Sequence, residues 1–286
     1  MENWPSIGHP HARPTTRRRP GGRCRVFESS SGVLKVELHA HSADDPLDAI
    51  PHTTAQLIDR AASLGYQALA VTLHDRQLDL RPYRSYAADR GVTLIQGTER
   101  TIRGKHVLLL NFRRGAEDVT NFDELRALKA REPGVVIAPH PFFPSSSALG
   151  RLAYRYADLF DAVEYNAMFT SAINFNAGAE RWARQHDAPV VGNGDIHRLR
   201  QMGTTYSLID AAPDADAICD AIRARRVRFV ASPITFLAAA GLMAELMTSR
   251  VLPAGFWDEP GEAAGFMVPR TPPSGASAPP PSVSAV

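Results

Sequence analysis

The stretch Glu37-Leu38-His39-Ala40-His41-Ser42 ends the first apolar segment of the chain, and the fold is inferred by working outward from it. Residues 33–41 have the apolar composition of a buried β-strand. His39 and His41 stand two positions apart, so on a strand their imidazoles point to the same face. The stretch therefore predicts a strand whose last residues present two histidines to one site.

Short apolar runs alternate with helical patterns along the chain. Strands are expected at 33–41, 68–73, 92–97, 105–112, 135–139, 162–166, 190–194, 205–209 and 229–231. Helices are expected at 54–64, 83–90, 123–131, 177–186, 215–225 and 238–247. This alternation predicts a parallel sheet covered by helices. Its repetition within about 220 residues favours a TIM-like (β/α) barrel over an open sheet.

Other imidazoles and carboxylates gather at the ends of the predicted strands, where the active face of a (β/α) barrel lies. They are His74, Glu99, His140, Asp195 and His197, and His106 begins a strand. Burial of so many polar groups without a partner would cost several kcal/mol, so we expect a multinuclear metal site. Imidazole and carboxylate without thiolate predict Zn, Mn or Fe rather than Mg or Ca.

The composition limits the class of protein and its compartment. The chain has 286 residues, 44% of them hydrophobic and 22% charged, as in a soluble globular protein. Cys24 and Cys219 form no CxxC pair, and the amino terminus lacks an apolar signal core. No run reaches the ~18 apolar residues of a membrane span. We expect a cytoplasmic protein without a membrane partner.

Two terminal segments differ in composition from the residues between them. Residues 1–30 are rich in Arg and Pro with a charge balance of +4, and residues 253–286 hold eight prolines with a balance of −2. Such segments bury too little apolar surface to fold, so both are expected to be disordered tails. Residues 31–252 form the predicted domain and are neutral overall, which argues against a dedicated nucleic-acid binder.

The motif set resembles that of the PHP (polymerase and histidinol phosphatase) family. The matching motifs occur in the family's order and cover residues 33–232: HxHS at 39–42, His74, GxE at 97–99, HP at 140–141 and GxDxH at 193–197. The resemblance implies a distorted seven-stranded (β/α) barrel holding two or three divalent metals.

The resemblance also implies how the ligands divide among the metals. One metal would take His39, His41, Glu99 and Asp195. A second would share Glu99 with His106 and His140. A third would take His74, His197 and an acid after HxHS, for which Asp44, Asp45 and Asp48 compete and Asp45 is chosen.

The chain departs from the family pattern where Thr72-Leu73-His74 replaces the common Thr-Asp-His. Residue 73 of a strand points away from the face of residue 74, so the missing Asp is not expected to be a ligand.

The expected chemistry is hydrolysis of a phosphoester by a hydroxide that bridges two metals. Glu99 and Asp195 are the candidate catalytic carboxylates, and Glu164 and Asn166 are expected to line the pocket. Four arginines follow the motifs and can meet phosphate charge: Arg76, Arg100, Arg198 and Arg200, of which Arg76 and Arg200 are assigned catalytic roles.

The substrate is expected to be a small phosphomonoester, a nucleotide or a short oligonucleotide, and the oligomeric state is left open. One alternative is a metal-dependent C–N hydrolase on a similar barrel. Such an enzyme usually has a carbamylated or bridging lysine at the metals. The chain has only Lys35, Lys105 and Lys129, and none of them ends a strand on the rim where the ligands lie, which disfavours this alternative. The other alternative is a non-catalytic metal-binding module. It is disfavoured because every ligand position holds a residue that can bind metal.

Overall fold

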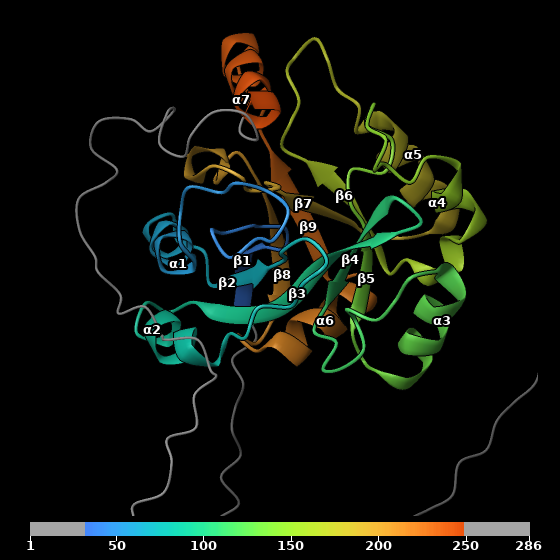
Figure 1. Ribbon diagram of the computed structural model, residues 1–286, viewed down its shortest axis with the longest axis horizontal. Helices are drawn as coiled ribbons and strands as arrows, with labels where there is room; N and C mark the ends of the chain where they lie inside the picture. The colour runs from blue at the N-terminus through green and yellow to red at the C-terminus, as the bar shows by residue number, and fades with distance from the viewer. Residues whose placement is uncertain (1–31, 249–286) are drawn as a thin grey trace, which may run out of the picture. The chain divides into compact units, whose positions relative to one another are not determined.

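The computed structural model describes residues 32–248, and the predicted tails at 1–30 and 253–286 lie outside this range. A nine-stranded sheet forms its centre (Figure 1). The strands are β1 (Gly32–Glu37), β2 (Ala68–Val71), β3 (Thr93–Ile102), β4 (Lys105–Leu110), β5 (Val135–Ala138), β6 (Ala162–Asn166), β7 (Val190–Asn193), β8 (Thr205–Ala211) and β9 (Val227–Ala231). Each of the nine strands expected from the sequence is present.

The helices connect these strands and cover the sheet. They are α1 (Thr54–Ser63), α2 (Arg84–Ala88), α3 (Phe122–Arg131), α4 (Arg151–Arg155), α5 (Ala177–His186), α6 (Ala215–Arg223) and α7 (Phe236–Thr248). Three 3₁₀ turns accompany them, η1 (Arg81–Tyr83), η2 (Ala157–Leu159) and η3 (Leu199–Gln201). The five-residue α4 was not predicted, because so short a helix has almost no periodicity to detect. No helix in the described range is long and apolar enough to cross a membrane.

The strands follow the order β7-β6-β5-β4-β3-β2-β1-β8-β9. The edge strands β7 and β9 pack against each other, so the sheet is nearly closed into a barrel. The expected barrel is confirmed, but it has nine strands where the resemblance implied seven. The expectation of a parallel sheet holds for only four of the eight pairings.

The other four pairings are antiparallel. The β3–β4 connection, for example, contains only Arg103 and Gly104, both with positive φ. A parallel connection needs a crossover of a dozen or more residues, so two residues can produce only a hairpin.

The barrel interior is apolar at one end. Alternate residues of the strands point inward, such as Val36 and Leu38 of the first strand, Leu108 and Leu110 of β4. Helix α6 adds Ile218 and Ile222 to the same cluster. It packs against β3, β5 and β8, and so fills the end of the barrel where the parallel strands begin.

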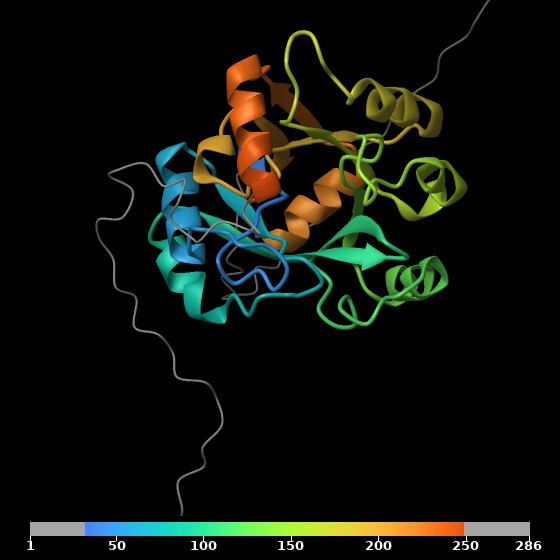
Figure 2. The ribbon, with the colours of Figure 1, turned by 45° about the horizontal axis from the view of Figure 1, so that its top comes forward.

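Two further apolar layers cover the outside of the sheet. On one side α1 packs on β2, where Leu57, Ile58 and Leu69 meet, and α2 packs on β3. On the other side α3, α4 and α5 pack on β4, β5 and β6 around the fully buried Trp182. Figures 1 and 2 show these two groups of helices on opposite sides of the strands. Only the end of the barrel where the parallel strands finish is left for polar residues.

Side chains fix where several helices begin. Thr53 and Gln56 form a reciprocal capping box at α1, while Asn121 and Asp214 cap the backbone N–H groups that open α3 and α6. Such caps are worth about 1 kcal/mol each. They also fix the entry angle of the chain into each helix, and with it the course of the strand-end loops.

Candidate metal centre

The predicted ligands lie together at the carboxyl ends of the parallel strands. Two isolated parallel bridges align these ends, one between Ala40 and Ile196 and one between His74 and Glu99. The backbone has a positive φ at Asp75, His140 and Asp195, of 53°, 28° and 51°. Residues at special backbone angles cluster at functional sites, where they re-aim side chains. The predicted ligands therefore come together where the chain turns sharply beyond the ends of the strands.

Glu99 stands at the centre of this cluster. Its Oε2 lies 3.2 Å from His39 Nε2, 3.4 Å from His41 Nε2 and 3.1 Å from His74 Nε2. Its Oε1 lies 2.6 Å from His106 Nδ1 and 3.2 Å from His140 Nε2. One carboxylate therefore lies close to five imidazoles that come from four different segments, three on one oxygen and two on the other.

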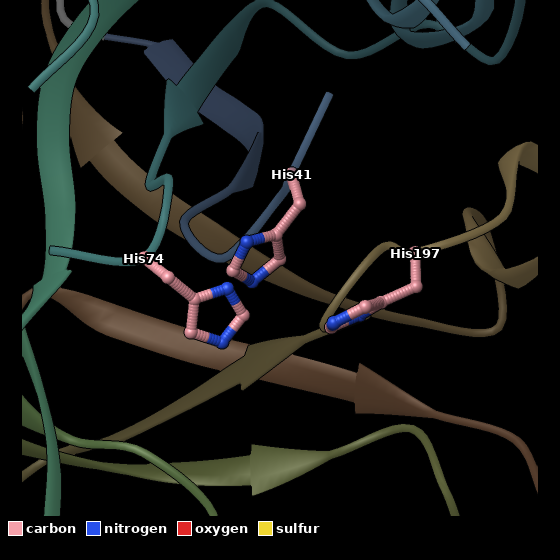
Figure 3. Close-up of side chains that lie close together, drawn as sticks. All are labelled: His41, His74 and His197. Carbon is pink, nitrogen blue, oxygen red and sulfur yellow. The ribbon is translucent and has the colours of Figure 1, made fainter. Parts of the chain in front are cut away.

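Asp195 and His197 complete the cluster from the other side. Asp195 Oδ1 lies 3.3 Å from His39 Nε2 and 3.4 Å from His197 Nδ1. Figure 3 shows the imidazoles of His41, His74 and His197 gathered around a common space. All nine predicted ligands except Asp45 fall into sets whose ligand atoms lie within 4.8 Å of one another: His41, His74 and His197; His39, Glu99 and His140; His39, His41 and Asp195; His74, Glu99 and His106.

The chemistry of these donors fits divalent metal ions. Within the described range, the buried Nε2 atoms of His39 and His41, Nδ1 of His106 and Oδ1 of Asp195 make no well-formed hydrogen bond. Buried polar atoms without a partner are costly and rare. Here they converge on one another as imidazole and carboxylate ligands do around Zn, Mn or Fe.

Opposite charges within the cluster shift the pKa values of its members. Burial by itself favours the neutral form of each group. The imidazoles of His39 and His106 outweigh burial and hold the pKa of Glu99 well below its ordinary value. The acceptor carboxylates of Asp195, Asp45 and Glu99 outweigh burial at His41 and raise its pKa to about 10, and those of Asp45 and Glu99 raise the pKa of His74 to about 9. Protons on the imidazoles thus balance the carboxylates, and metal cations can replace these protons.

Asp45 was predicted to bind a third metal together with His74 and His197, but it and Asp48 contact different histidines. Asp45 Oδ2 accepts hydrogen bonds from Nδ1 of both His41 and His74, at 2.9 and 3.0 Å. Its Oδ1 accepts the backbone N–H groups of Leu47 and Asp48. Asp48 Oδ2 instead lies 3.2 Å from His197 Nε2. Asp45 is thus placed to orient two histidines, and Asp48 is the acid that reaches the third.

Glu164 and Asn166, both at the end of β6, line the site as expected. Glu164 Oε2 accepts a hydrogen bond of 2.8 Å from His39 Nδ1, and Asn166 donates to Asp195 Oδ2 at 3.2 Å. A carboxylate on the second nitrogen of a ligand histidine fixes its tautomer and its ring orientation. Asn193 also donates to Glu164, so the support of His39 is itself held in place.

Two supporting residues had no signal in the sequence. Buried Glu37 accepts hydrogen bonds from the backbone N–H groups of His39 and Gly194, and burial raises its pKa to about 8. His52 donates from Nε2 to the carbonyl of His41, and burial lowers its pKa to about 4. Both hold backbone atoms of ligand segments, Glu37 across 157 residues to Gly194 and His52 across 11 residues to His41, and no periodic pattern encodes either contact.

Gly194 is required by the close approach of these segments. A Cβ at this position would lie 2.1 Å from Ile196 Cδ1 and 3.1 Å from Glu37 Oε2. The glycine of the GxDxH motif is thus explained by packing.

The arginines that follow the motifs differ in their contacts. Arg100 pairs with Asp75, and Arg198 and Arg200 both reach Glu245 of α7, which is buried. Arg76 is exposed and contacts only the carbonyl oxygen of Asp44, at 3.4 Å, among its polar contacts in the described range. Of the two arginines predicted as catalytic, Arg76 keeps its guanidinium accessible, whereas Arg200 ties the η3 segment to α7.

The fold and the cluster define a metal-binding barrel, and comparisons with known proteins agree. Residues 174–227 match the family described as PHP-associated. The error-prone DNA polymerase of Mycobacterium tuberculosis is 38% identical over 112 residues, which cover 35% of this chain and 10% of the polymerase. The PolC-type DNA polymerase III of Lactococcus lactis is 35% identical over 74 residues, or 26% of this chain and 4% of that protein. The chain thus matches a tenth or less of these relatives' length.

Two solved structures share the fold. A two-domain protein from Bacteroides vulgatus, described as containing a predicted PHP-like metal-dependent phosphoesterase, has a TM-score of 0.54 at 18% identity. The match covers 76% of this chain and 70% of that one. PsfC from Pseudomonas syringae has a TM-score of 0.52 at 16% identity, covering 76% and 98% of the two chains. The matched segment, the polymerase relatives and the shared fold agree with the resemblance to PHP proteins that the sequence motifs show.

Proposed function

We propose that this protein is a divalent-metal-dependent hydrolase of phosphoesters, acting on a small phosphomonoester, a nucleotide or a short oligonucleotide. The observation that carries the proposal is the position of Glu99, whose two oxygens contact five imidazoles from four segments. A carboxylate so placed can bridge two cations. Two or three ions of Zn, Mn or Fe suit the donor set.

The residues of the cluster would hold these ions as ligands. When bound, divalent metals supply a water acidic enough to attack phosphorus and neutralise the charge of the phosphoryl oxygens. Glu99 and Asp195 would supply negative charge to offset the cations. Glu164 and Asp45 accept the Nδ1 protons of His39, His41 and His74, which fixes the tautomers so that the Nε2 atoms are free to bind.

Arg76 is the cation proposed to meet the phosphate at the rim. Its guanidinium is exposed, follows His74 by two positions and has no acidic partner among the described residues. Arginine matches phosphate with paired N–H donors. Arg198 and Arg200 are committed to Glu245, so they are proposed to position the segment after His197.

The positions of the lysines argue against a C–N hydrolase that uses a bridging lysine. Lys35 donates to the carbonyl of Leu64, Lys105 to that of Ser146, and Lys129 pairs with Asp161. None of them contacts the cluster. All the predicted ligand types are present and near one another, which supports catalysis over a purely structural metal module.

The test measures metal content and hydrolysis in the same preparation. Protein purified without chelator is expected to carry two or three transition-metal ions per chain, as elemental analysis measures. Phosphorylated metabolites and short oligonucleotides are then screened with Mn and Zn separately. A chain that takes up less than one equivalent of either metal, or that hydrolyses none of these compounds when loaded, would contradict the proposal.

A further inference from the structure

Two phenylalanine rings lie beside the metal centre. Phe143 stands in the loop between β5 and α4, and Phe175 in the loop between β6 and α5. The ring of Phe143 lies edge-on to that of His140, with 6.3 Å between their centroids, and the ring of Phe175 lies 5.6 Å from that of Phe143. The two rings therefore extend outward from a ligand histidine as one aromatic patch.

The turn after His140 sends Phe143 to the metal side. The backbone N–H of Phe143 donates to the carbonyl of His140 at 3.2 Å. The preceding residue, Phe142, points the other way and packs on the outer apolar layer beside Gly178 of α5. Phe142 thus packs against the apolar core, whereas Phe143 belongs to none of the apolar clusters of the described range.

Phe175 is exposed but held by its neighbours. Asn176 is fully buried and makes two hydrogen bonds of 2.9 Å with the backbone of Asn166. Asn174 donates to the hydroxyl of Tyr165. Asn166 itself donates to Asp195, so the residue that supports a metal ligand also anchors the loop that carries Phe175. The β6–α5 loop extends beyond the strand ends (Figure 1).

Phe175 differs from other exposed hydrophobic residues in its place beside the metal centre, where its ring contacts that of Phe143. Its side chain is 42% exposed, although burial of an aromatic ring is among the larger contributions to stability. An exposed ring fixed at the edge of a site is typical of a surface that binds a ligand.

We propose that Phe143 and Phe175 form a subsite for the planar aromatic part of the phosphoester, a nucleobase or an aryl group attached next to the phosphoryl group. This inference rests on the proposed function and narrows its substrate class. Aromatic side chains stack on the face of any nucleobase, so such a patch selects for a flat ring without reading its identity. Phosphate at the metals and a base on the rings would occupy adjacent parts of one site.

The test compares substrates with and without a ring. Metal-loaded wild-type protein and the F175A, F175W and Y154A variants are assayed with a nucleoside monophosphate, an aryl phosphate and glycerol phosphate. In F175A the ratio of kcat/KM between nucleoside monophosphate and glycerol phosphate should fall about tenfold, which is ~1.4 kcal/mol, mainly through KM. F175W should restore the ratio. The aryl phosphate shows whether a bare ring is sufficient or a base is needed.

Tyr154 provides the matched control. It is 44% exposed, and its ring lies against that of His186 at the other end of α5. Y154A should keep the wild-type ratio. A ratio in F175A within about twofold of wild type, with both substrates turned over, would overturn the subsite while leaving the proposed function in place.

A binding measurement separates failure of the subsite from failure of the proposed activity. The dissociation constant of a nucleoside monophosphate for the metal-loaded protein is determined by calorimetry, with no turnover required. It should rise about tenfold in F175A relative to wild type and Y154A. Equal constants would overturn the subsite even if no phosphoester were hydrolysed.

Discussion

Glu99 of β3 and Leu108 of β4 lie directly opposite each other, and both are essentially inaccessible to solvent. Leu108 belongs to the apolar interior that α6 completes, whereas Glu99 holds the centre of the polar cluster. Strand β4 also passes from polar to apolar along its interior face, since His106 stands two positions before Leu108 on the same face. The barrel interior therefore has an apolar end and a polar end, separated by one step along a strand.

The two ends differ in what burial achieves. At the apolar end, side chains pack against one another and burial itself stabilises the fold. At the polar end, buried nitrogen and oxygen atoms remain without hydrogen-bond partners, and burial of such atoms is unfavourable. The apolar end is stabilised by its own packing, whereas the polar end holds buried nitrogen and oxygen atoms that a cation could bind.

The largest expected effect comes from exchanging Glu99 for Gln. Glu99→Gln removes the charge that would hold two cations together but keeps the shape of the side chain. Turnover should fall about a thousandfold, equivalent to ~4 kcal/mol of transition-state stabilisation. Hydrolysis of an aryl phosphate, metal content and thermal unfolding are measured together. Retention of more than about a tenth of the activity would show that Glu99 does not have this role.

The opposite residue provides the contrasting variant. Leu108→Ala should lower the free energy of unfolding by about 2–5 kcal/mol through the cavity it leaves. The folded fraction should bind as much metal as wild type. Denaturant unfolding and elemental analysis test this. A Leu108→Ala protein that is fully folded but binds less metal would contradict the claim that the apolar end contributes to stability and not to metal binding.

Metal removal should destabilise the protein through the polar end. A ligand present at about a hundred times its dissociation constant stabilises the folded state by ~2.7 kcal/mol. Chelator treatment should therefore lower the melting temperature, and added Mn or Zn should restore it. Equal melting temperatures with and without metal would mean that the ion pairs between the imidazoles and carboxylates stabilise the cluster as well as metal does.

A smaller effect is expected at the support of a ligand. Glu164→Gln weakens the hydrogen bond that orients His39, and loss of such a partner costs about 10–100-fold in metal affinity. Metal titration followed by calorimetry measures it. Glu180→Gln, on α5, is the control with the same chemical change outside the cluster, and similar losses in both variants would contradict the assigned role.

The smallest effect is expected at the exposed rim. Arg76→Ala should raise KM for a phosphoester about fivefold with a smaller change in kcat, because an exposed cation is screened by solvent. Arg81→Ala, which removes an exposed arginine paired with Asp79, is the control. A change confined to kcat would place Arg76 in the chemical step rather than in binding.

The sequence was sufficient to predict the position of the polar end. Each ligand follows or begins an apolar strand, and strand ends converge in any barrel. The i and i+2 spacing of His39 with His41 and of Asp195 with His197 predicts that each pair shares a site, and each pair does so, although β1 ends at Glu37 and β7 at Asn193, so both pairs lie just beyond their strands. These are local properties, so they are legible without a structure.

Contacts between distant segments could not be predicted. Asp44, Asp45 and Asp48 stand in one irregular loop, and no periodicity indicates that Asp45 would accept two Nδ1 protons while Asp48 faces His197. The pairing of Arg200 with Glu245 joins residues of two segments that only the folded chain brings together. Side-chain partners of this kind depend on loop paths and rotamers.

The bridge between Ala40 and Ile196 has a consequence for the order of folding. It aligns the HxHS and GxDxH segments, which are separated by most of the described chain. Contacts of such long sequence separation form slowly, because the loop between them must first be closed. We therefore expect metal uptake to be a late event that reports closure of the barrel. In refolding experiments, metal binding should lag behind the formation of helices.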